Sequence, residues 1–445
     1  MEGNELPNNW VLTDLGTLSN LVRGVSYKKA DASQIKTEIY DTLILRGGNI
    51  QDGALVDGKD EIYVNSQLVK NTQLVKKSDV VIVGSTGSKK LIGKAGISLQ
   101  DYTDTAFGAF LMLARAHKKI NPNYFANFFL SKFYRDRIRE LAGGVNINNI
   151  RKEYITEMKF PLPPRPEQDR IVAKVDTLMA QLENMQKSLD RIPQLLKDFR
   201  QQVLTQAVTG KLTEEWREGK VLDNSVTLHL EDISYSITDG DHQAPPQVEN
   251  GIPFLVISNV SKGYFDFNGV TRFVPKKYFE NLKDSRVPSK GDILYTVTGS
   301  FGIPLLVDFD KDFCFQRHIA IIRPKQDIVL SSYLWIHLKS QNARTQAERV
   351  ATGTAQMTVP LRGLRKFIFE IHSILEQKEI VHRVESLFAK ADTIEEKYQS
   401  LKTKIDTLPQ AILHKAFKGE LVEQLERDGD ARELLKEIEG LKKVK

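Results

Sequence analysis

The chain lacks the features that mark secreted, membrane and cysteine-metal proteins. Its 445 residues include a single cysteine, Cys314, so an internal disulfide is impossible and a cysteine-based zinc site is not expected. Its longest apolar runs, such as Val80–Val83 and Phe254–Ile257, have the length of a strand and cannot span a bilayer. The segment Met1–Asn9 is polar and acidic, without the apolar stretch of a signal peptide. We therefore predict a cytoplasmic protein that contacts no membrane.

Sequence motifs of a nucleotide, methyl-donor or metal site are also lacking. Gly87–Ala95 resembles a phosphate-binding loop, but five residues separate its glycines instead of four, and Ala95 stands where a Mg²⁺-binding hydroxyl is needed. The Pro-Pro pairs at 163–164 and 245–246 lack the flanking residues of an amino-methyltransferase site. The eight histidines are scattered without ligand spacing. We expect no catalytic residue, no metal and no cofactor in this chain.

The composition is that of an ordinary globular protein with a mild basic excess. Hydrophobic residues make up 41% of the chain and charged residues 27%, and the length suffices for two or three domains. The net charge of +6 and the isoelectric point of about 9.0 are compatible with nucleic-acid binding but indicate it only weakly.

An internal repeat is the main positive feature of the sequence. Glu167–Val172 reappears 209 positions later as Glu376–Val381, and the same offset pairs Gly210 with Gly419 without a gap. Further upstream the two copies agree only with small shifts. Chance does not supply such an ungapped run, so the chain is a tandem duplication whose halves agree closely in one part and diverge in the other.

The closely agreeing part predicts two long helices. Its apolar residues alternate in spacings of three and four, which is a heptad seam that requires a partner helix. Each helix would have about 40 residues and a length of roughly 60 Å. Gly210 and Gly419 stand where C-terminal caps belong, and Pro193 and Pro409 should each kink their helix. The predicted seam residues are Ile171, Val175, Leu178, Leu182, Leu189 and Leu196 in the first copy, and Ile380, Val384, Leu387, Ile394, Leu401 and Ile405 in the second.

An intermolecular coiled coil or ordinary core helices would also explain these seams, but one chain that carries both favours pairing within the chain. The diverging parts, residues 10–160 and 226–370, are called here the first module and the second module. Short β-rich runs such as Val80–Val83 and Asp292–Thr296 alternate with turns, and each module has a helix-like stretch, Tyr124–Arg139 or Tyr333–Glu348.

The predicted fold class is α+β: two similar mixed α/β domains joined by two long antiparallel helices in a coiled coil with pseudo-two-fold symmetry. The predicted boundaries are a first domain at 1–164, a first helix at 165–212, a second domain at 213–372, a second helix at 373–419 and a tail at 420–445.

Two pairs of matched turns are the candidate contacts to DNA. Ser85–Lys90 combines a turn, hydroxyl groups and two lysines, which are groups that hold phosphates, while its counterpart Thr298–Ser300 keeps the turn without the lysines. The second pair is Gly143–Asn149 and Thr352–Gln356. Asparagine and glutamine can read adenine edges, and arginine can read guanine.

Any one of these side chains is more often a solvated or capping residue, whereas sets of them on matched turns favour DNA contact. For Arg135, Arg137 and Arg139, a phosphate-contacting edge and a solvated face both stay open. The candidate DNA-binding residues are Arg23, Lys28, Lys29, Arg46, Asn49, Ser85, Thr86, Ser88, Lys89, Lys90, Asn146, Asn148, Asn149, His242, Asn259, Arg272, Thr298, Ser300, Arg317, His318, Thr354 and Gln356.

The segments at the ends of the predicted helices carry a family resemblance. Phe160–Gln168 leads into a helix that ends at Thr209–Leu212, and Leu375–Val381 leads into one that ends at Lys418–Leu421. These segments, with the glycine-rich turns ahead of them, resemble the specificity subunits of bacterial type I restriction–modification enzymes over nearly the whole chain. Trp10 and the segments 23–29 and 146–150 look closest to members from enteric bacteria. The second copy departs from the pattern, with Glu370–Ser373 in place of the proline-rich lead-in.

The resemblance implies two target recognition domains, each reading one half of an asymmetric bipartite site in double-stranded DNA. The paired helices would set the spacer and dock two modification subunits, which methylate adenine at N6 with S-adenosylmethionine. Two restriction subunits would add cleavage that depends on ATP and Mg²⁺. The chain itself would then be a non-catalytic subunit. The alternatives are a stand-alone DNA-modifying enzyme and a coiled-coil adaptor that contacts protein only.

Overall fold

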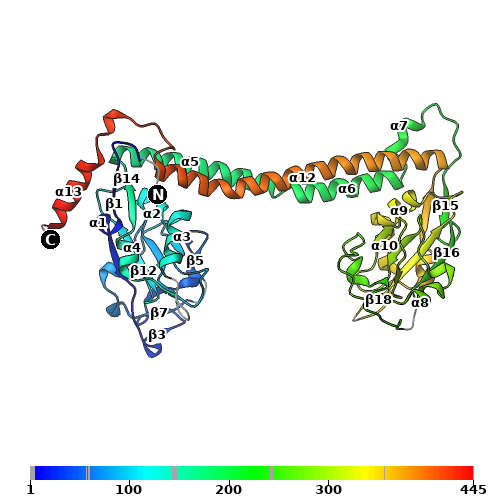
Figure 1. The fold of residues 1–445 in the computed structure, drawn as a ribbon, viewed down its shortest axis with the longest axis horizontal. Helices are drawn as coiled ribbons and strands as arrows, with labels where there is room; N and C mark the ends of the chain where they lie inside the picture. Colours follow the sequence, from blue (N-terminus) through cyan, green and yellow to red (C-terminus); the bar gives the residue numbers. More distant parts are fainter. Residues whose placement is uncertain are drawn as a thin grey trace. The chain divides into compact units, whose positions relative to one another are not determined.

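The computed structural model describes residues 6–56, 58, 61–142, 148–240, 244–354 and 356–443, and Figure 1 shows its ribbon. These residues form two compact units. Unit 1 consists of Met1–Leu189 and Leu401–Lys445, and unit 2 consists of Asp190–Ser400. Each unit holds one module together with segments of long helix. Both units combine helices with sheets, which confirms the predicted α+β class.

Two sheets form the centre of the first module, in the strand orders β2-β12-β8-β10-β6-β5 and β11-β4-β7-β3, while β1 pairs with β14. The predicted strand Val80–Val83 is β8, which pairs with β10 and β12, and it is buried along its whole length because its alternate side chains face two hydrophobic cores. The strands of unit 1 are β1 (Val11–Asp14), β2 (Ser19–Arg23), β3 (Ala32–Ser33), β4 (Thr42–Leu45), β5 (Ile50–Gln51), β6 (Ala54–Leu55), β7 (Tyr63–Val64), β8 (Val80–Val83), β9 (Ser85–Thr86), β10 (Ala95–Ile97), β11 (Thr105–Phe107), β12 (Leu111–Ala116), β13 (Asn148–Asn149) and β14 (Lys159–Leu162).

The helices of unit 1 pack beside these sheets around an aromatic core. The helix-like stretch Tyr124–Arg139 is divided into α2 and α3, because the Ser131 hydroxyl accepts a hydrogen bond from the backbone N–H of Tyr134 and caps α3. The helices are α1 (Leu15–Leu18), α2 (Pro122–Phe128), α3 (Lys132–Leu141), α4 (Lys152–Thr156), α5 (Arg165–Leu189), α13 (Ala431–Lys443) and the last part of α12 (Ile374–Lys418).

Unit 2 repeats this plan with fewer strands. Its sheets have the orders β16-β22-β19-β20 and β18-β17-β21, and β15 pairs with β23 as β1 does with β14. Its strands are β15 (Val226–His229), β16 (Ser234–Asp239), β17 (Ile252–Leu255), β18 (Phe273–Val274), β19 (Ile293–Thr296), β20 (Pro304–Leu306), β21 (Cys314–Phe315), β22 (Ile319–Pro324) and β23 (Ile368–Ile371). Its helices are α6 (Ile192–Val208), α7 (Glu214–Arg217), α8 (Lys276–Glu280), α9 (Ser331–Lys339), α10 (Gln341–Val350), α11 (Leu361–Arg365) and the first part of α12.

The first long helix is interrupted, whereas the second is not. We predicted one kinked helix over 165–212, but α5 ends at Leu189 and α6 begins at Ile192. Pro193 therefore lies in the first turn of α6, where a backbone N–H would have no acceptor within the helix, so its absence costs no hydrogen bond. Pro409 lies inside α12, which continues through it. Gly210 and Gly419 follow the helices with φ of 68° and 75°, so both caps are confirmed.

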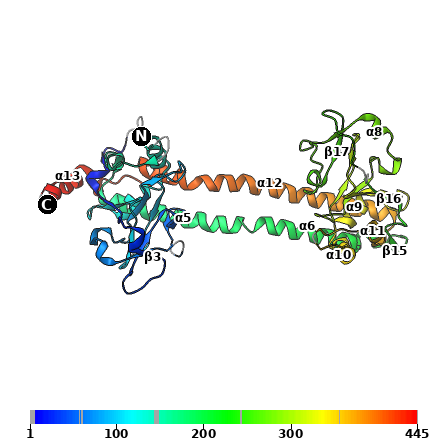
Figure 2. The same cartoon turned by 90° about the horizontal axis from the view of Figure 1, so that it is seen from below.

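In each unit, the beginning of one long helix lies beside the end of the other (Figure 2). In unit 1, Ile171 and Val175 near the start of α5 share one hydrophobic core with Leu413 and Phe417 near the end of α12. In unit 2, the end of α6 shares a core with the start of α12, and Arg200 makes ion pairs with Asp392 (2.7 Å) and Glu395 (2.8 Å). The helices are antiparallel within each unit, as predicted.

The predicted seam is buried at only part of its positions. The buried seam residues are Ile171, Val175, Leu182, Leu196, Ile380, Val384 and Ile405. The half-buried or exposed ones are Leu178, Leu189, Leu387, Ile394 and Leu401.

A buried glutamine joins each module to the start of its long helix in the same way. The Gln168 side chain accepts a hydrogen bond from the Asn121 N–H (2.8 Å) and donates one to the Pro163 carbonyl (2.9 Å). The Gln377 side chain accepts one from the Leu330 N–H (2.8 Å) and donates to the Ile328 and His372 carbonyls. The second copy thus attaches to its helix without the proline-rich lead-in.

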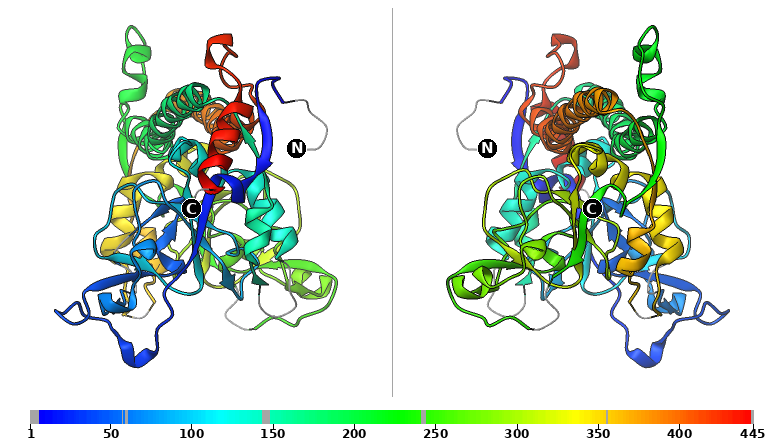
Figure 3. Two further views of the ribbon diagram at one scale, coloured as in Figure 1. Left: turned by 90° about the vertical axis from the view of Figure 1, so that its left-hand side faces the viewer. Right: turned by 90° about the vertical axis from the view of Figure 1, so that its right-hand side faces the viewer.

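The C-terminal tail belongs to unit 1, where α13 lies against the first module (Figure 3). Ala431 and Ile438 enter the core of that module, and the Ala431 N–H donates a hydrogen bond to the Asn9 carbonyl (2.9 Å). Arg170 of α5 pairs with Asp428, whose side chain is 3% exposed (2.5 Å). The segment that follows α12 therefore completes unit 1. No helix among the described residues is long and apolar enough to cross a membrane.

Candidate nucleic-acid interface

The same ion pair anchors the central strands of both modules. Arg115 donates from Nε and Nη2 to the two carboxylate oxygens of Asp79 (2.8 and 2.5 Å), and Arg323 does the same to Asp292 (2.9 and 2.8 Å). The hydrogen bond to the carboxylate raises the pKa of each arginine, and both carboxylates are buried. These pairs fix β8 to β12 and β19 to β22, and so hold the turns that leave those strands.

The matched turns singled out from the sequence lie next to each other in both modules. In the first module β9 pairs with β13, so that Asn149 lies opposite Ser85. In the second, Thr298 forms a bridge with Thr358, and the Gly299 N–H donates to the Met357 carbonyl (3.0 Å). In each module the described residues of the two turns therefore lie side by side.

Arg135 holds the lysine-bearing loop that follows β9. Its guanidinium donates from Nη1 to the Ile92 carbonyl (2.7 Å) and from Nη2 to the Lys90 carbonyl (2.9 Å). Lys89 and Lys90 are exposed on this loop. Arg135 is thus used inside the protein, and Arg137 makes an exposed ion pair with Glu140. Arg135 therefore holds the backbone that carries the two exposed lysines, which are side chains able to contact phosphates.

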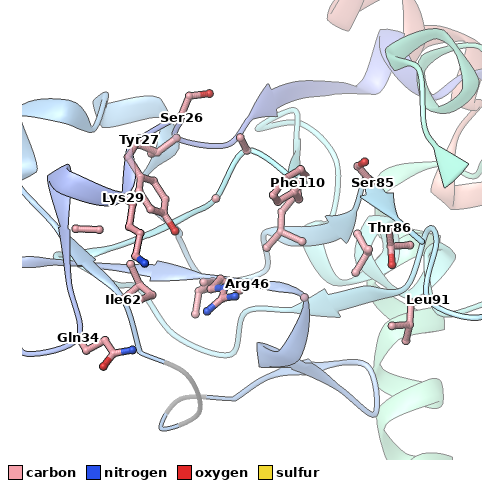
Figure 4. Close-up of a pocket in the computed structure, with 18 of the residues that line it drawn as sticks. Ser26, Tyr27, Lys29, Gln34, Arg46, Ile62, Ser85, Thr86, Leu91 and Phe110 are labelled. Atoms are coloured by element: carbon pink, nitrogen blue, oxygen red, sulfur yellow. The ribbon is translucent and has the colours of Figure 1, made fainter. Parts of the chain in front are cut away.

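A cleft of about 920 Å³ in the first module gathers predicted and unpredicted residues (Figure 4). The predicted residues on its lining are Lys29, Arg46, Ser85 and Thr86. Sequence reasoning missed Ser26, Tyr27, Gln34 and Phe110, which line it as well. Two cations, several hydroxyl and amide groups and two aromatic rings in one cleft can bind both the backbone and the bases of a nucleic acid.

The turn between β11 and β12 and its counterpart between β21 and β22 have the same backbone hydrogen bond and different side chains. In the first module it is Gly108–Leu111, where the Leu111 N–H donates to the Gly108 carbonyl (2.8 Å). In the second it is Gln316–Ile319, where the Ile319 N–H donates to the Gln316 carbonyl (3.1 Å). Phe110 in one turn corresponds to His318 in the other. Burial, with Arg317 adding to it, lowers the pKa of His318, so that imidazole is neutral at pH 7.

Asn49 and Asn259 hold the backbone of their own loops, so their side chains are not available for contact with DNA bases. The Asn49 carboxamide accepts a hydrogen bond from the Arg46 N–H (2.8 Å) and donates to the Val56 carbonyl (3.0 Å). The Asn259 carboxamide accepts from the Val256 N–H (3.0 Å) and donates to the Asp266 carbonyl (3.4 Å). Both are buried and close equivalent loops, which is the physical reason that the two copies match here.

The other candidates are distributed over several surfaces. Thr298 is buried, and its hydroxyl accepts a hydrogen bond from Thr358 (3.3 Å), so it holds the turn instead of facing solvent. Asn146 and His242 lie outside the described residues, and only the backbone of Asn148 is described. The candidates that are exposed outside the cleft are Arg23, Lys28, Lys89, Lys90, Asn149, Arg272, Ser300, Arg317, Thr354 and Gln356, and Ser88 and His318 are partly buried.

No group of three or more histidine, cysteine, aspartate or glutamate side chains in the described part of the chain is placed to hold a metal ion. Cys314 is buried in β21, and burial raises the pKa of its thiol to about 12. It stays protonated and packs as a core residue.

Comparison with known families assigns this architecture to a class. The family model described as "Type I restriction modification DNA specificity domain" matches residues 7–194 and 245–403. Since the two matches span well over half of the chain, the chain belongs to this family. It is a specificity subunit of a type I restriction–modification system, and it recognises DNA sequence.

Individual relatives agree with this assignment and confirm the predicted resemblance to enteric members. The EcoKI specificity subunit of Escherichia coli K12 is 35% identical over 435 residues, covering 95% of this chain and 92% of the relative. The StySPI specificity subunit of Salmonella potsdam is 32% identical over 440 residues, with 95% and 92% covered. The crystal structure of the HsdS subunit from Thermoanaerobacter tengcongensis has a TM-score of 0.65 over 94% of this chain and 99% of that chain, and its 18% identity shows the fold alone.

Proposed function

We propose that this chain reads a bipartite, asymmetric DNA site, with each module reading one half. The observation that carries the proposal is the equivalent turn at Gly108–Leu111 and Gln316–Ile319, whose hydrogen bonds match and whose exposed side chains differ. The same backbone turn with different side chains allows the two modules to recognise different DNA sequences through the same kind of interface. Phosphate contacts from exposed lysines and arginines position the modules, while the side chains on the turns provide specificity.

We further propose that the long helices dock two modification subunits. Each unit exposes a comparable set of apolar side chains on its long helices, although a solvated helix face normally carries polar residues. In unit 1 these are Met185, Leu401 and Leu408, and in unit 2 they are Leu195, Phe199, Leu375 and Ile394. Met185 and Ile394 are equivalent at the repeat offset of 209, as are Phe199 and Leu408, and these equivalent pairs favour two copies of one partner.

In this proposal the chain is a non-catalytic cytoplasmic subunit without a cofactor of its own. The modification subunits bind S-adenosylmethionine and methylate adenine at N6. Through them, two restriction subunits add translocation and cleavage that depend on ATP and Mg²⁺. The long helices set the number of unread base pairs between the two half-sites.

A module exchange tests the assignment of half-sites. Residues 10–160 are replaced by the corresponding module of another family member, the complex with modification subunits is expressed, and methylated adenines are mapped across the genome. We expect one half of the methylated motif to change and the other half to stay. The matched control replaces residues 226–370 and should change only the other half. A motif that stays whole in both exchanges would refute the proposal.

The spacer role of the helices is tested by inserting one heptad into α5 and one heptad into the part of α12 that lies in unit 1. The insertion keeps the seam in phase. We expect the same two half-sites with a longer gap between them in the methylation map. A single-residue insertion at the same place is the control, because it rotates the seam and should abolish methylation. An unchanged gap after the heptad insertion contradicts a spacer role of the helices.

A further inference from the structure

Phe110 is an aromatic side chain that the fold leaves outside its core. The side chain is 73% exposed, although its neighbours in sequence, Phe107 and Leu111, are buried. A phenyl ring gains nothing from folding when it remains in water. It also lies on the lining of the 920 Å³ cleft, with Lys29 and Arg46 (Figure 4).

The backbone that carries this ring is fixed from three directions. The Phe110 carbonyl accepts hydrogen bonds from the N–H groups of Gly84 (2.9 Å) and Ser85 (3.0 Å). The Gly108 N–H donates to the Leu45 carbonyl (2.9 Å), and the Gly24 N–H donates to the Leu111 carbonyl (3.3 Å). A Cβ atom at Gly24 would lie 2.1 Å from the Gly108 carbonyl oxygen, so the two backbones touch. These bonds fix the backbone from which the Phe110 side chain extends into the lining of the cleft.

The second module keeps this frame and changes the side chain. The Val297 N–H donates to the His318 carbonyl (2.9 Å), as Gly84 does to Phe110, and the Gly240 N–H donates to the Ile319 carbonyl (3.4 Å), as Gly24 does to Leu111. The polar, half-buried His318 stands where the first module exposes a phenyl ring. The ring is therefore not required by the frame, and its role belongs to the first module alone.

Resting on the proposed function, we propose that Phe110 is a specificity-determining residue that inserts its ring at one base step of the half-site read by the first module. The cations of the cleft hold the phosphates on either side of the ring. A phenyl ring forms no hydrogen bond to phosphate or sugar, and the surfaces of DNA that match it are the thymine methyl group and base faces exposed by partial unstacking. Its affinity contribution is therefore independent of salt, unlike that of the neighbouring cations.

The experiment uses the complex of the full chain with modification subunits and a short duplex carrying the target found by methylation mapping. Affinity is measured as a function of salt concentration for the wild type, Phe110→Ala, Phe110→Trp and Phe110→His. We expect Phe110→Ala and Phe110→His to bind the target about tenfold more weakly, with the salt dependence and the binding to unrelated DNA unchanged. Phe110→Trp should bind within about twofold of the wild type, because an indole also stacks.

Two controls identify the source of any effect. Arg46→Ala should weaken binding to all sequences and lower the slope of log affinity against log salt by about one. Leu99→Ala removes another apolar side chain of the first module that is also 73% exposed, and it lies outside the cleft, so its binding should equal the wild type.

Insertion itself is read with 2-aminopurine placed at successive positions of the half-site. The wild-type complex should raise its fluorescence at one step, and Phe110→Ala should abolish that rise. Unchanged affinity of Phe110→Ala overturns the inference, as does a lost affinity without any fluorescence change in the wild type. If the wild-type complex does not discriminate its target from unrelated DNA, the proposed function fails instead.

Discussion

The two modules differ most at their exposed turns and least where they meet the long helices. At the helix starts, Gln168 and Gln377 make corresponding hydrogen bonds to backbone groups 209 residues apart. At the turns, the backbone hydrogen bonds agree while Phe110 and His318 do not resemble each other. Duplicated units that bind the same partner subunit and different DNA sequences should diverge in this way. The cores of the two units also differ at several equivalent positions.

The largest difference inside the cores concerns the end of each long helix. Phe417 at the end of α12 packs against Tyr124, Phe128 and Phe160, with ring centroids 5.1, 5.4 and 6.3 Å away. The equivalent residue at the end of α6 is Val208, also buried. We expect Phe417→Ala to destabilise unit 1 by about 4 kcal/mol and Val208→Ala to destabilise unit 2 by about 2 kcal/mol.

Hydrogen–deuterium exchange of peptides from each unit measures both effects separately. In the Phe417→Ala variant the peptides of unit 1 should lose protection while those of the second module keep theirs. Equal losses from the two substitutions would show that the helix ends contribute alike in the two units, and would contradict the larger contribution expected of Phe417.

A second difference concerns the buried glutamates at the helix starts. Glu376 accepts hydrogen bonds from Thr213 and Arg217, each 2.6 Å long, whereas Glu167 accepts them from the neutral donors Trp10 (3.0 Å) and Asn9 (3.4 Å). Burial raises the pKa of Glu167, and this rise is partly offset by hydrogen bonds from Gln424, Trp10 and Asn9 and by the charge of Arg170. The charge of the carboxylate therefore matters more at Glu376.

We expect Glu376→Gln to destabilise unit 2 by about 1.5 kcal/mol, a value reduced because the partner arginine is one-third exposed. Glu167→Gln should cost less than about 0.5 kcal/mol, since the amide oxygen still accepts from Trp10. Urea unfolding of the two variants provides the comparison. A larger cost at Glu167 would mean that its carboxylate is charged and stabilised by groups other than these donors.

A third difference between the cores predicts an effect of the opposite sign, at His337. His337 is buried in unit 2, and neither ring nitrogen has a hydrogen-bond partner within the described structure. Burial, with a further contribution from His372, lowers the pKa of His337 to about 3. The equivalent residue in unit 1 is Phe128, which packs among aromatic rings. We expect His337→Phe to stabilise unit 2 by about 1 kcal/mol at pH 7.

The pH dependence provides an independent check. Between the ordinary histidine pKa of about 6.5 and about 3, the unfolded chain binds a proton that folded His337 does not, so stability falls as the pH falls through this window. His337→Phe should make that decline shallower by up to one proton. Phe128→His is the reciprocal control and should introduce the same decline into unit 1. Parallel pH profiles for wild type and His337→Phe would contradict the buried, neutral imidazole.

The repeat, the antiparallel helices and the glycine caps were predictable because they depend on local periodicity and on one fixed offset. The division of the first helix at Asp190 was not predicted, since proline in a first turn and proline inside a helix look alike in sequence. Asn49 and Asn259 were assigned to DNA because matching asparagines can signal either contact or loop closure. Phe110 was not among the predicted site residues, because the position of its backbone depends on hydrogen bonds from Gly84 and Ser85, which a local sequence pattern does not reveal.

The composition of unit 1 has a consequence for biosynthesis. Unit 2 is one continuous stretch, Asp190–Ser400, whereas unit 1 needs Leu401–Lys445 to cover the core of the module that leaves the ribosome first. At about 5–20 residues per second, the first module waits roughly ten to fifty seconds for the segment that contains Phe417 and α13. During that time its aromatic core lacks the part of its cover that Leu413, Phe417 and α13 provide. The first module to be synthesised is therefore the last to have its core completed.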